Sequence, residues 1–92
     1  MRGGRVKPLR EIVAFVSISI MPRSYYPEVL KRIKEIEEVE EIYGVTGEYD
    51  LLLRIKVNDM KTFSERLGLI SSLRGVSKTY TMLVVDAIKE RP

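Results

Sequence analysis

The side chains best suited to binding chemistry lie in the middle of the chain, where residues 45–53 read Val-Thr-Gly-Glu-Tyr-Asp-Leu-Leu-Leu. Tyr49 supplies a hydroxyl and Asp50 a carboxylate at the start of an otherwise apolar segment. Gly47 tolerates a positive φ, which favours a tight turn at Gly47-Glu48 between two extended segments. A functional site is expected here first. The residues alone favour a plainer interpretation, with Gly47 as a hairpin glycine, Tyr49 in the core and Asp50 as a cap at a strand end.

The composition lacks the commonest catalytic groups. The 92 residues include no Cys and no His, which removes thiolates, disulfides and the commonest general base and metal ligand. We therefore expect no enzymatic activity, no metal site and no cofactor. A chain without Cys suits the cytoplasm, and no apolar run is long enough to cross a membrane. The richness in Lys, Glu and Arg leans towards a thermophilic source.

The net charge of +3 is unevenly spread along the chain. Residues 1–10 carry four basic side chains and no acidic one, whereas the remaining residues carry twelve basic and thirteen acidic side chains. Two Gly and one Pro among these ten residues predict a mobile basic arm, followed by one domain over residues 11–92. A nucleic-acid reader normally has a basic face on its folded part, so specific DNA binding is not expected.

Apolar periodicity predicts four strands and two helices. The strands are expected at residues 11–20, 41–46, 49–57 and 76–88, and the helices at residues 25–38 and 60–73. Asn58 or Asp59 would cap the second helix, and Gly68 inside it predicts a close packing contact. The order β-α-β-β-α-β predicts a ferredoxin-like α+β fold, with two helices on one face of a four-stranded antiparallel sheet.

The second face of this sheet is also expected to be apolar. Three of the predicted strands carry apolar residues of both parities, including Leu52, Leu83 and Val85. Two helices cover one face, so a monomer would expose a larger apolar patch than soluble monomers usually tolerate. We expect the sheet of a second copy, related by a twofold axis, to cover this face.

Three segments carry a resemblance to a known family. They are residues 45–53, then Val57-Asn58-Asp59-Met60, and finally Leu73-Arg74-Gly75-Val76 followed by Thr79-Tyr80-Thr81-Met82-Leu83-Val84-Val85. In this order and spacing they resemble the C-terminal half of the Lrp/AsnC, or feast/famine, transcription regulators, which is their RAM effector-binding module. The resemblance extends over about residues 11–90. It implies sheet-packed homodimers that assemble into rings, such as octamers, with a small amino acid bound in clefts between neighbouring dimers.

The resemblance also implies which residues form the ligand site. They are Thr46, Gly47, Glu48, Tyr49, Asp50, Met60, Thr81, Met82, Leu83 and Val84. Asp50 would meet an α-ammonium, backbone N–H groups near Gly47 an α-carboxylate, and Met60, Met82 and Leu83 an apolar side chain. The resemblance favours binding roles for Gly47 and Asp50 and leaves residues 81–84 open. Glu48 departs from the family, in which Asp is frequent, and its longer side chain could change or close the pocket.

The family's helix-turn-helix does not fit in the ten residues before the first strand. The resemblance therefore implies a stand-alone module that senses an amino acid or a related metabolite and modulates Lrp/AsnC-type regulation without binding DNA itself. It could also join assemblies of full-length relatives. Two alternatives share the fold: a dimeric α+β-barrel enzyme, with a polar pocket between helices and sheet, and an ACT-like regulatory subunit. An RNA-binding RRM is excluded because its basic-glycine-aromatic motif is missing.

Overall fold

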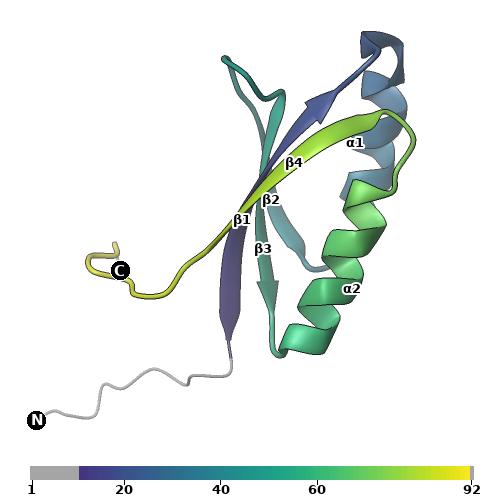
Figure 1. Cartoon of the computed structure of the whole chain (residues 1–92). Coiled ribbons are helices and arrows are strands. Elements are labelled where there is room, and N and C mark those ends of the chain that lie inside the picture. The colour runs from purple at the N-terminus through teal and green to yellow at the C-terminus, as the bar shows by residue number, and fades with distance from the viewer. Residues whose placement is uncertain (1–10, 92) are drawn as a thin grey trace, which may run out of the picture.

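The computed structural model describes residues 11–91, so the basic arm predicted at residues 1–10 lies outside the described residues. The described part follows the predicted β-α-β-β-α-β order, with a short 3-10 helix added before the first α-helix (Figure 1). The elements are β1 (Ile12–Ile20), η2 (Arg23–Tyr25), α1 (Tyr26–Lys34), β2 (Val39–Gly44), β3 (Leu51–Val57), α2 (Met60–Ser71) and β4 (Val76–Leu83).

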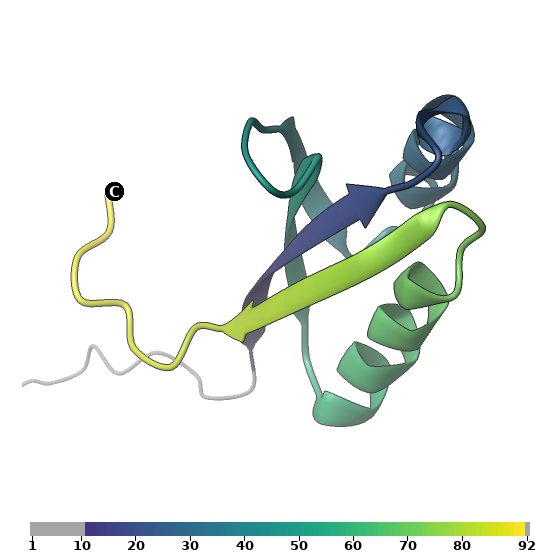
Figure 2. The same ribbon diagram turned by 45° about the horizontal axis from the view of Figure 1, so that its top comes forward.

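The four strands form one antiparallel sheet in the order β2-β3-β1-β4. Both helices lie on the same face of this sheet, which the two views of the ribbon show clearly (Figures 1 and 2). The ferredoxin-like α+β arrangement expected from the element order is therefore confirmed. No helix among residues 11–91 has the length and apolar character that crossing a membrane requires.

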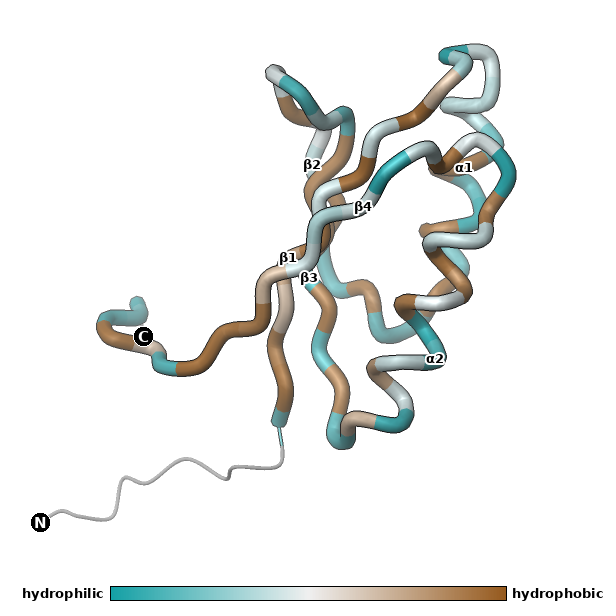
Figure 3. The backbone as a smooth tube through the Cα atoms, viewed as in Figure 1, coloured by the Kyte–Doolittle hydropathy of each residue, from teal (hydrophilic) through white to brown (hydrophobic). Residues whose placement is uncertain are grey.

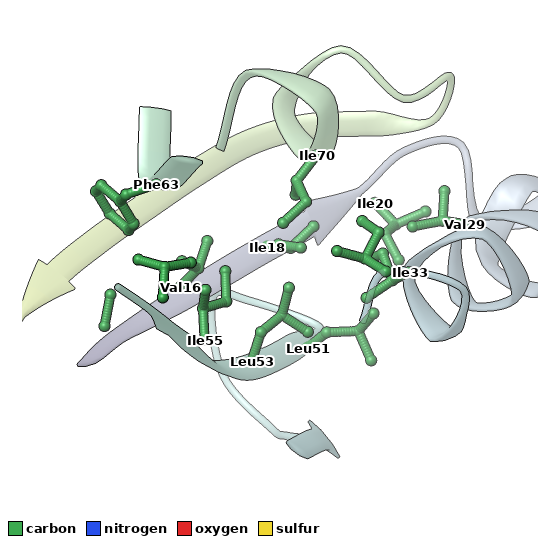
Figure 4. Close-up of a cluster of buried hydrophobic side chains, with 13 residues drawn as sticks. Val16, Ile18, Ile20, Val29, Ile33, Leu51, Leu53, Ile55, Phe63 and Ile70 are labelled. Atoms are coloured by element: carbon green, nitrogen blue, oxygen red, sulfur yellow. The ribbon is translucent and has the colours of Figure 1, made fainter. Parts of the chain in front are cut away.

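The hydrophobic core fills the space between the sheet and the two helices. Alternate residues of β1 and β3 point into it because successive side chains of a strand face opposite sides. They meet Val29 and Ile33 from α1 and Phe63 and Ile70 from α2 (Figure 4). The core strand residues are Ala14, Val16, Ile18, Ile20, Leu51, Leu53, Ile55 and Val57.

The opposite face of the sheet, here called the open face, is covered by no element of the described chain (Figure 2). Tyr43, Leu52, Ser17 and Tyr80 lie side by side across its four strands. Tyr80 is 55% exposed, and Tyr43 and Met82 are also exposed. The prediction of apolar side chains on this second face is confirmed, and apolar residues continue along the tail after β4 (Figure 3).

Several element ends differ from the predicted ones. Helix α1 ends at Lys34 and α2 at Ser71, each earlier than expected, and β4 ends at Leu83 instead of residue 88. The shortening of β4 has a simple cause, because its partner β1 begins at Ile12 and the last bond between them is Val84 N–H to Val13 O. The expected close contact at Gly68 is wrong, since no atom outside its own stretch of helix backbone lies within 4 Å of a Cβ built there.

The tight turn expected at Gly47-Glu48 is also wrong. Strand β2 begins at Val39 and ends at Gly44, and β3 begins at Leu51, so a six-residue loop over residues 45–50 joins them. The backbone of Asp50 bonds to both sides, since its N–H donates to Ile18 O of β1 at 2.7 Å and its carbonyl accepts from Val45 N at 3.0 Å. The loop is the part of the fold that matters most for the candidate site.

Candidate functional site

The loop over residues 45–50 lies at one end of the sheet, beside the end of β1. It is closed by a hydrogen bond from Val45 N to Asp50 O at 3.0 Å. Gly47 adopts a φ of 104°, a conformation that L side chains rarely take, so the predicted need for glycine at this position is confirmed. The loop residues from Val45 to Glu48 are exposed, which leaves their backbone groups accessible to a ligand.

Asp50 connects this loop to the end of β1. Its Oδ2 accepts a hydrogen bond from Ile20 N at 2.7 Å, and its Oδ1 accepts one from Arg23 Nη1 at 2.7 Å. The predicted role of Asp50 as a cap at a strand end is confirmed, because Ile20 is the last residue of β1. The Arg23 guanidinium also lies over the Tyr26 ring, with Cζ 5.2 Å from the ring centroid.

A second ion pair fastens the other side of the loop to β4. Lys78 Nζ lies 2.9 Å from Glu48 Oε2, and Ser19 Oγ donates to Glu48 O at 3.0 Å. The hydrogen bond to the Glu48 carboxylate raises the pKa of Lys78 above its ordinary value. This pairing draws Glu48 across the end of β1 towards β4.

Tyr49 lies on the open-face side of the sheet. Its ring centroid is 6.4 Å from that of Tyr80, and Lys78 Nζ lies 5.3 Å from the Tyr49 centroid. Tyr49 is half-buried and is absent from the core cluster, so the expectation that it packs in the core is wrong. The hydroxyl-bearing ring is instead part of the surface that a second copy is expected to cover.

Of the remaining candidate residues, Met60, Leu83 and Val84 lie towards the opposite end of the sheet, whereas Thr81 and Met82 lie near the middle of the pairing between β4 and β1. Leu83 pairs with Ala14 near the start of β1, whereas Asp50 lies at the end of β1, next to Ile18 and Ile20. Five residues separate Lys78, beside the loop, from Leu83, which corresponds to about 17 Å along a strand. Met60 opens α2 directly after the end of β3 and is exposed. The candidates are therefore spread along the sheet.

The side chains of the candidate residues on β4 point to different faces of the sheet. Thr81 pairs with the core residue Val16 and is half-buried on the helix face, while Met82, its neighbour, is exposed on the open face. Leu83 and Val84 are exposed where β4 leaves the sheet. The structure thus brings Thr46, Gly47, Glu48, Tyr49 and Asp50 together and places Met60, Leu83 and Val84 towards the other end of the sheet, with Thr81 and Met82 between them on β4.

Two charged residues at the loop were missed by the sequence analysis. Arg23 and Lys78 lie 27 and 30 residues from their acidic partners, so no local spacing could reveal either pair. Residues 11–91 hold no group of three acidic side chains close enough to bind a metal ion. The loop and its neighbours offer two acidic and two basic side chains and exposed backbone groups, which suit the recognition of charged, hydrogen-bonding ligands.

The fold and the surfaces described above define a ferredoxin-like α+β domain with one helix-covered face, one open face and a polar loop at the sheet end. Residues 13–92 match the family model of the Lrp/AsnC ligand binding domain. The chain belongs to this family. The resemblance seen in the sequence is thereby confirmed.

Individual relatives agree with this assignment. The HTH-type transcriptional regulator FL11 of Pyrococcus furiosus is 32% identical over 79 residues, covering 86% of this chain and 52% of that protein. The chain thus spans about half the length of this regulator. A crystal structure from Thermus thermophilus is 32% identical with a TM-score of 0.78, covering 86% of this chain and 99% of that one. Escherichia coli AsnC, 21% identical with a TM-score of 0.82, shares the fold over 100% of this chain and 66% of its own.

Two further matches carry functional information about the relatives themselves. A transcriptional regulator from Neisseria meningitidis, solved as a complex with L-Met, is 25% identical with a TM-score of 0.79, over 98% of this chain and 62% of that one. A homocitrate synthase from Sulfurisphaera tokodaii is 32% identical over 85 residues, which cover 89% of this chain and only 18% of that enzyme. The same kind of domain therefore matches parts of regulators and a part of an enzyme.

Proposed function

We propose that this protein senses a small amino acid, or a related metabolite, in a site formed between copies of the chain. One observation supports the proposal: the loop lies at one end of the sheet and Leu83 near the other, about 17 Å along β4 from Lys78, which is beside the loop. A free amino acid is too small to touch both ends of one copy. The two ends can meet around one ligand when the loop of one copy approaches the β4 end of another.

The open face supplies the surface for a first contact between copies. Tyr43, Tyr80 and Met82 are exposed on it, in a sheet face that also carries the charged residues Arg54 and Lys56, and exposed apolar groups of this kind mark interaction surfaces. A twofold axis would place two open faces against each other and remove these side chains from water. We therefore propose sheet-packed homodimers, which assemble further into an octamer or a similar ring.

The loop is polar, like the head group of an amino acid, whereas the other candidate residues are mostly apolar, like a hydrophobic amino-acid side chain. Asp50 carries the carboxylate for an α-ammonium, and the exposed backbone around Gly47 offers hydrogen bonds for an α-carboxylate. Met60, Met82 and Leu83 supply apolar surface for a side chain. The Neisseria meningitidis relative was solved with L-Met, which makes this amino acid the first probe to use.

Modulation of Lrp/AsnC-type transcription regulation without direct DNA binding is the role that we propose for this sensing. Four of the sixteen basic residues lie in the first ten positions. The remainder of the chain carries twelve basic and thirteen acidic side chains and is therefore nearly neutral. A neutral domain offers little attraction to phosphates. Association with full-length relatives such as FL11, in a cytoplasmic setting, would then be the route of action.

One observation favours a second candidate, a regulatory subunit of a biosynthetic enzyme. The matched region makes up only 18% of the homocitrate synthase, so the domain there accompanies a much larger protein. Catalysis by the present chain is not proposed. A dimeric α+β-barrel enzyme needs a polar pocket between helices and sheet, and the core cluster that fills this space in residues 11–91 is wholly apolar.

Isothermal titration against the twenty amino acids, combined with native mass measurement, tests the proposal. At least one amino acid should release heat, and the assembly should contain an even number of copies with and without it. Variants at the two ends test both parts of the site: Thr46→Tyr at the loop and Leu83→Asp at the β4 end should each abolish binding. Heat that survives in a monomer would overturn the site between copies, and no heat from any amino acid would overturn the sensing role.

A further inference from the structure

Arg23 is a basic residue that lies next to the loop proposed to receive the ligand. Its Nη1 is 2.7 Å from Asp50 Oδ1, and its side chain is 71% exposed. The guanidinium is also supported from one side by the Tyr26 ring, 5.2 Å away. A guanidinium carries five N–H donors in a planar fork, so a group bound to Asp50 through Nη1 can still offer donors to a second anion.

Asp50 is held much more firmly than its partner. Its side chain is only 22% exposed, its Oδ2 accepts from Ile20 N at 2.7 Å, and its own backbone N–H donates to Ile18 O at 2.7 Å. The pair therefore consists of a fixed carboxylate and an accessible guanidinium. The guanidinium and the carboxylate lie side by side, so each can face the group of opposite charge in the head group of an α-amino acid.

We propose that Arg23 joins the backbone around Gly47 in binding the α-carboxylate of the ligand while Asp50 binds its α-ammonium, so that this ion pair selects zwitterionic head groups. This inference rests on the function proposed above and names the residue that distinguishes an amino acid from an amine. The guanidinium fork matches a carboxylate with two parallel hydrogen bonds. The ammonium shares the Asp50 carboxylate with Arg23, and the exposed Arg23 side chain is the partner that rearranges.

The second ion pair at the loop fits this role less well. The Glu48 side chain is 71% exposed, and Lys78 presents a compact charge without a fork. Lys78 also lies over the Tyr49 ring, beside Tyr80 on the open face, where a second copy is proposed to pack. Arg23 follows β1 in the short segment before α1 and remains accessible next to the loop.

The experiment compares L-methionine with L-methioninamide, which keeps the ammonium and replaces the carboxylate by a neutral amide of similar size. Where L-methionine gives no heat, the amino acid that does so in the full screen is used with its own amide. In the wild type the amino acid should bind about tenfold or more tightly than its amide. In Arg23→Gln the amino acid should lose about tenfold in affinity, while the amide changes by less than about threefold.

Arg32→Gln is the matched control, because Arg32 is an exposed arginine of α1 whose carboxylate partner Glu35 is 3.9 Å away. This variant should preserve both affinities. Arg23→Lys keeps the charge without the fork and should fall between the wild type and Arg23→Gln. Equal losses of amino acid and amide in Arg23→Gln would overturn the role of Arg23 and leave the proposed function intact. A wild type that binds none of the twenty amino acids would overturn both.

Discussion

A Cβ atom on Gly75 would lie 2.5 Å from the Cβ of Tyr25. The turn before β4 thus presses directly against η2, and Met21 N donates to Gly75 O at 2.9 Å across the same junction. Gly75 also has a φ of 99°, which side chains rarely adopt. The contact lies directly before β4, which begins at Val76.

Replacement of Gly75 by alanine should therefore destabilise the fold strongly. The positive φ costs about 1–2 kcal/mol for a residue with a side chain, and the overlap with Tyr25 adds about 1–3 kcal/mol. Gly47→Ala is the matched control, because Gly47 has a φ of 104° but no atom within 4 Å of the built Cβ. Urea unfolding at one fixed chain concentration measures both losses. Equal losses would contradict the close contact at Gly75.

Truncation of the core should produce a cavity at the centre of the sheet. Leu53 is fully buried between β1, β2 and the helix layer (Figure 4), so Leu53→Ala should lower the free energy of unfolding by about 2–5 kcal/mol. Leu69→Ala, at an exposed position of α2, should cost less than about 1 kcal/mol. Thermal unfolding followed by circular dichroism compares the two. A loss of stability for Leu53→Ala no larger than that for Leu69→Ala would contradict the burial of Leu53 in the core.

The start of α2 should contribute a pH-dependent part of stability. Asp59 Oδ1 accepts from Thr62 N at 2.7 Å, and this hydrogen bond lowers the pKa of Asp59 below its ordinary value of 3.8. A lowered folded-state pKa stabilises the fold above the unfolded-state pKa, and the contribution is lost as the pH falls through the folded-state value. Unfolding in urea from pH 7 down to pH 2 measures it.

Asp59→Asn is the informative comparison for this prediction. Asparagine still accepts a hydrogen bond at a helix N-terminus but does not titrate in this range. The difference in unfolding free energy between the wild type and Asp59→Asn should shrink as the pH drops below about 4. A difference that is constant with pH would mean that the charge of Asp59 adds nothing to the cap.

Disruption of the open face should change the state of assembly without unfolding the chain. Tyr80 is exposed in the row that crosses all four strands, so Tyr80→Lys should place like charges against each other in a sheet-packed dimer. Native mass measurement should show a smaller assembly, with circular dichroism unchanged. Leu69→Lys on α2 provides the control and should leave the mass as in the wild type. An unchanged mass for Tyr80→Lys would contradict packing through this face.

The elements of this fold could be predicted because each has a simple local cause. Leu51, Leu53 and Ile55 alternate towards the core, which is the period of a strand with one buried face. Val29 and Ile33 are four residues apart on one side of a helix. The ends of the elements were harder to predict, because they depend on contacts between residues far apart in the sequence, such as the hydrogen bond from Asp50 N–H to Ile18 O.

The candidate site could be predicted only in part. The resemblance pointed to the loop and the β4 residues, but their separation depends on register, which pairs Leu83 with Ala14 and brings Asp50 beside Ile20. The pair formed by Arg23 and Asp50 joins residues 27 positions apart. Such a contact arises only after the sheet has formed, so no pattern of neighbouring residues could indicate it.

The separation of the loop from the far end of β4 would determine how bound ligands are distributed among the copies of an assembly. A copy whose loop contacts one neighbour and whose β4 end contacts another contributes to two ligand sites at once. The number of bound molecules would then equal the number of chains in a closed ring. Each molecule that leaves would loosen one junction and thereby affect two copies, so the response to its concentration would be steeper than that of independent sites.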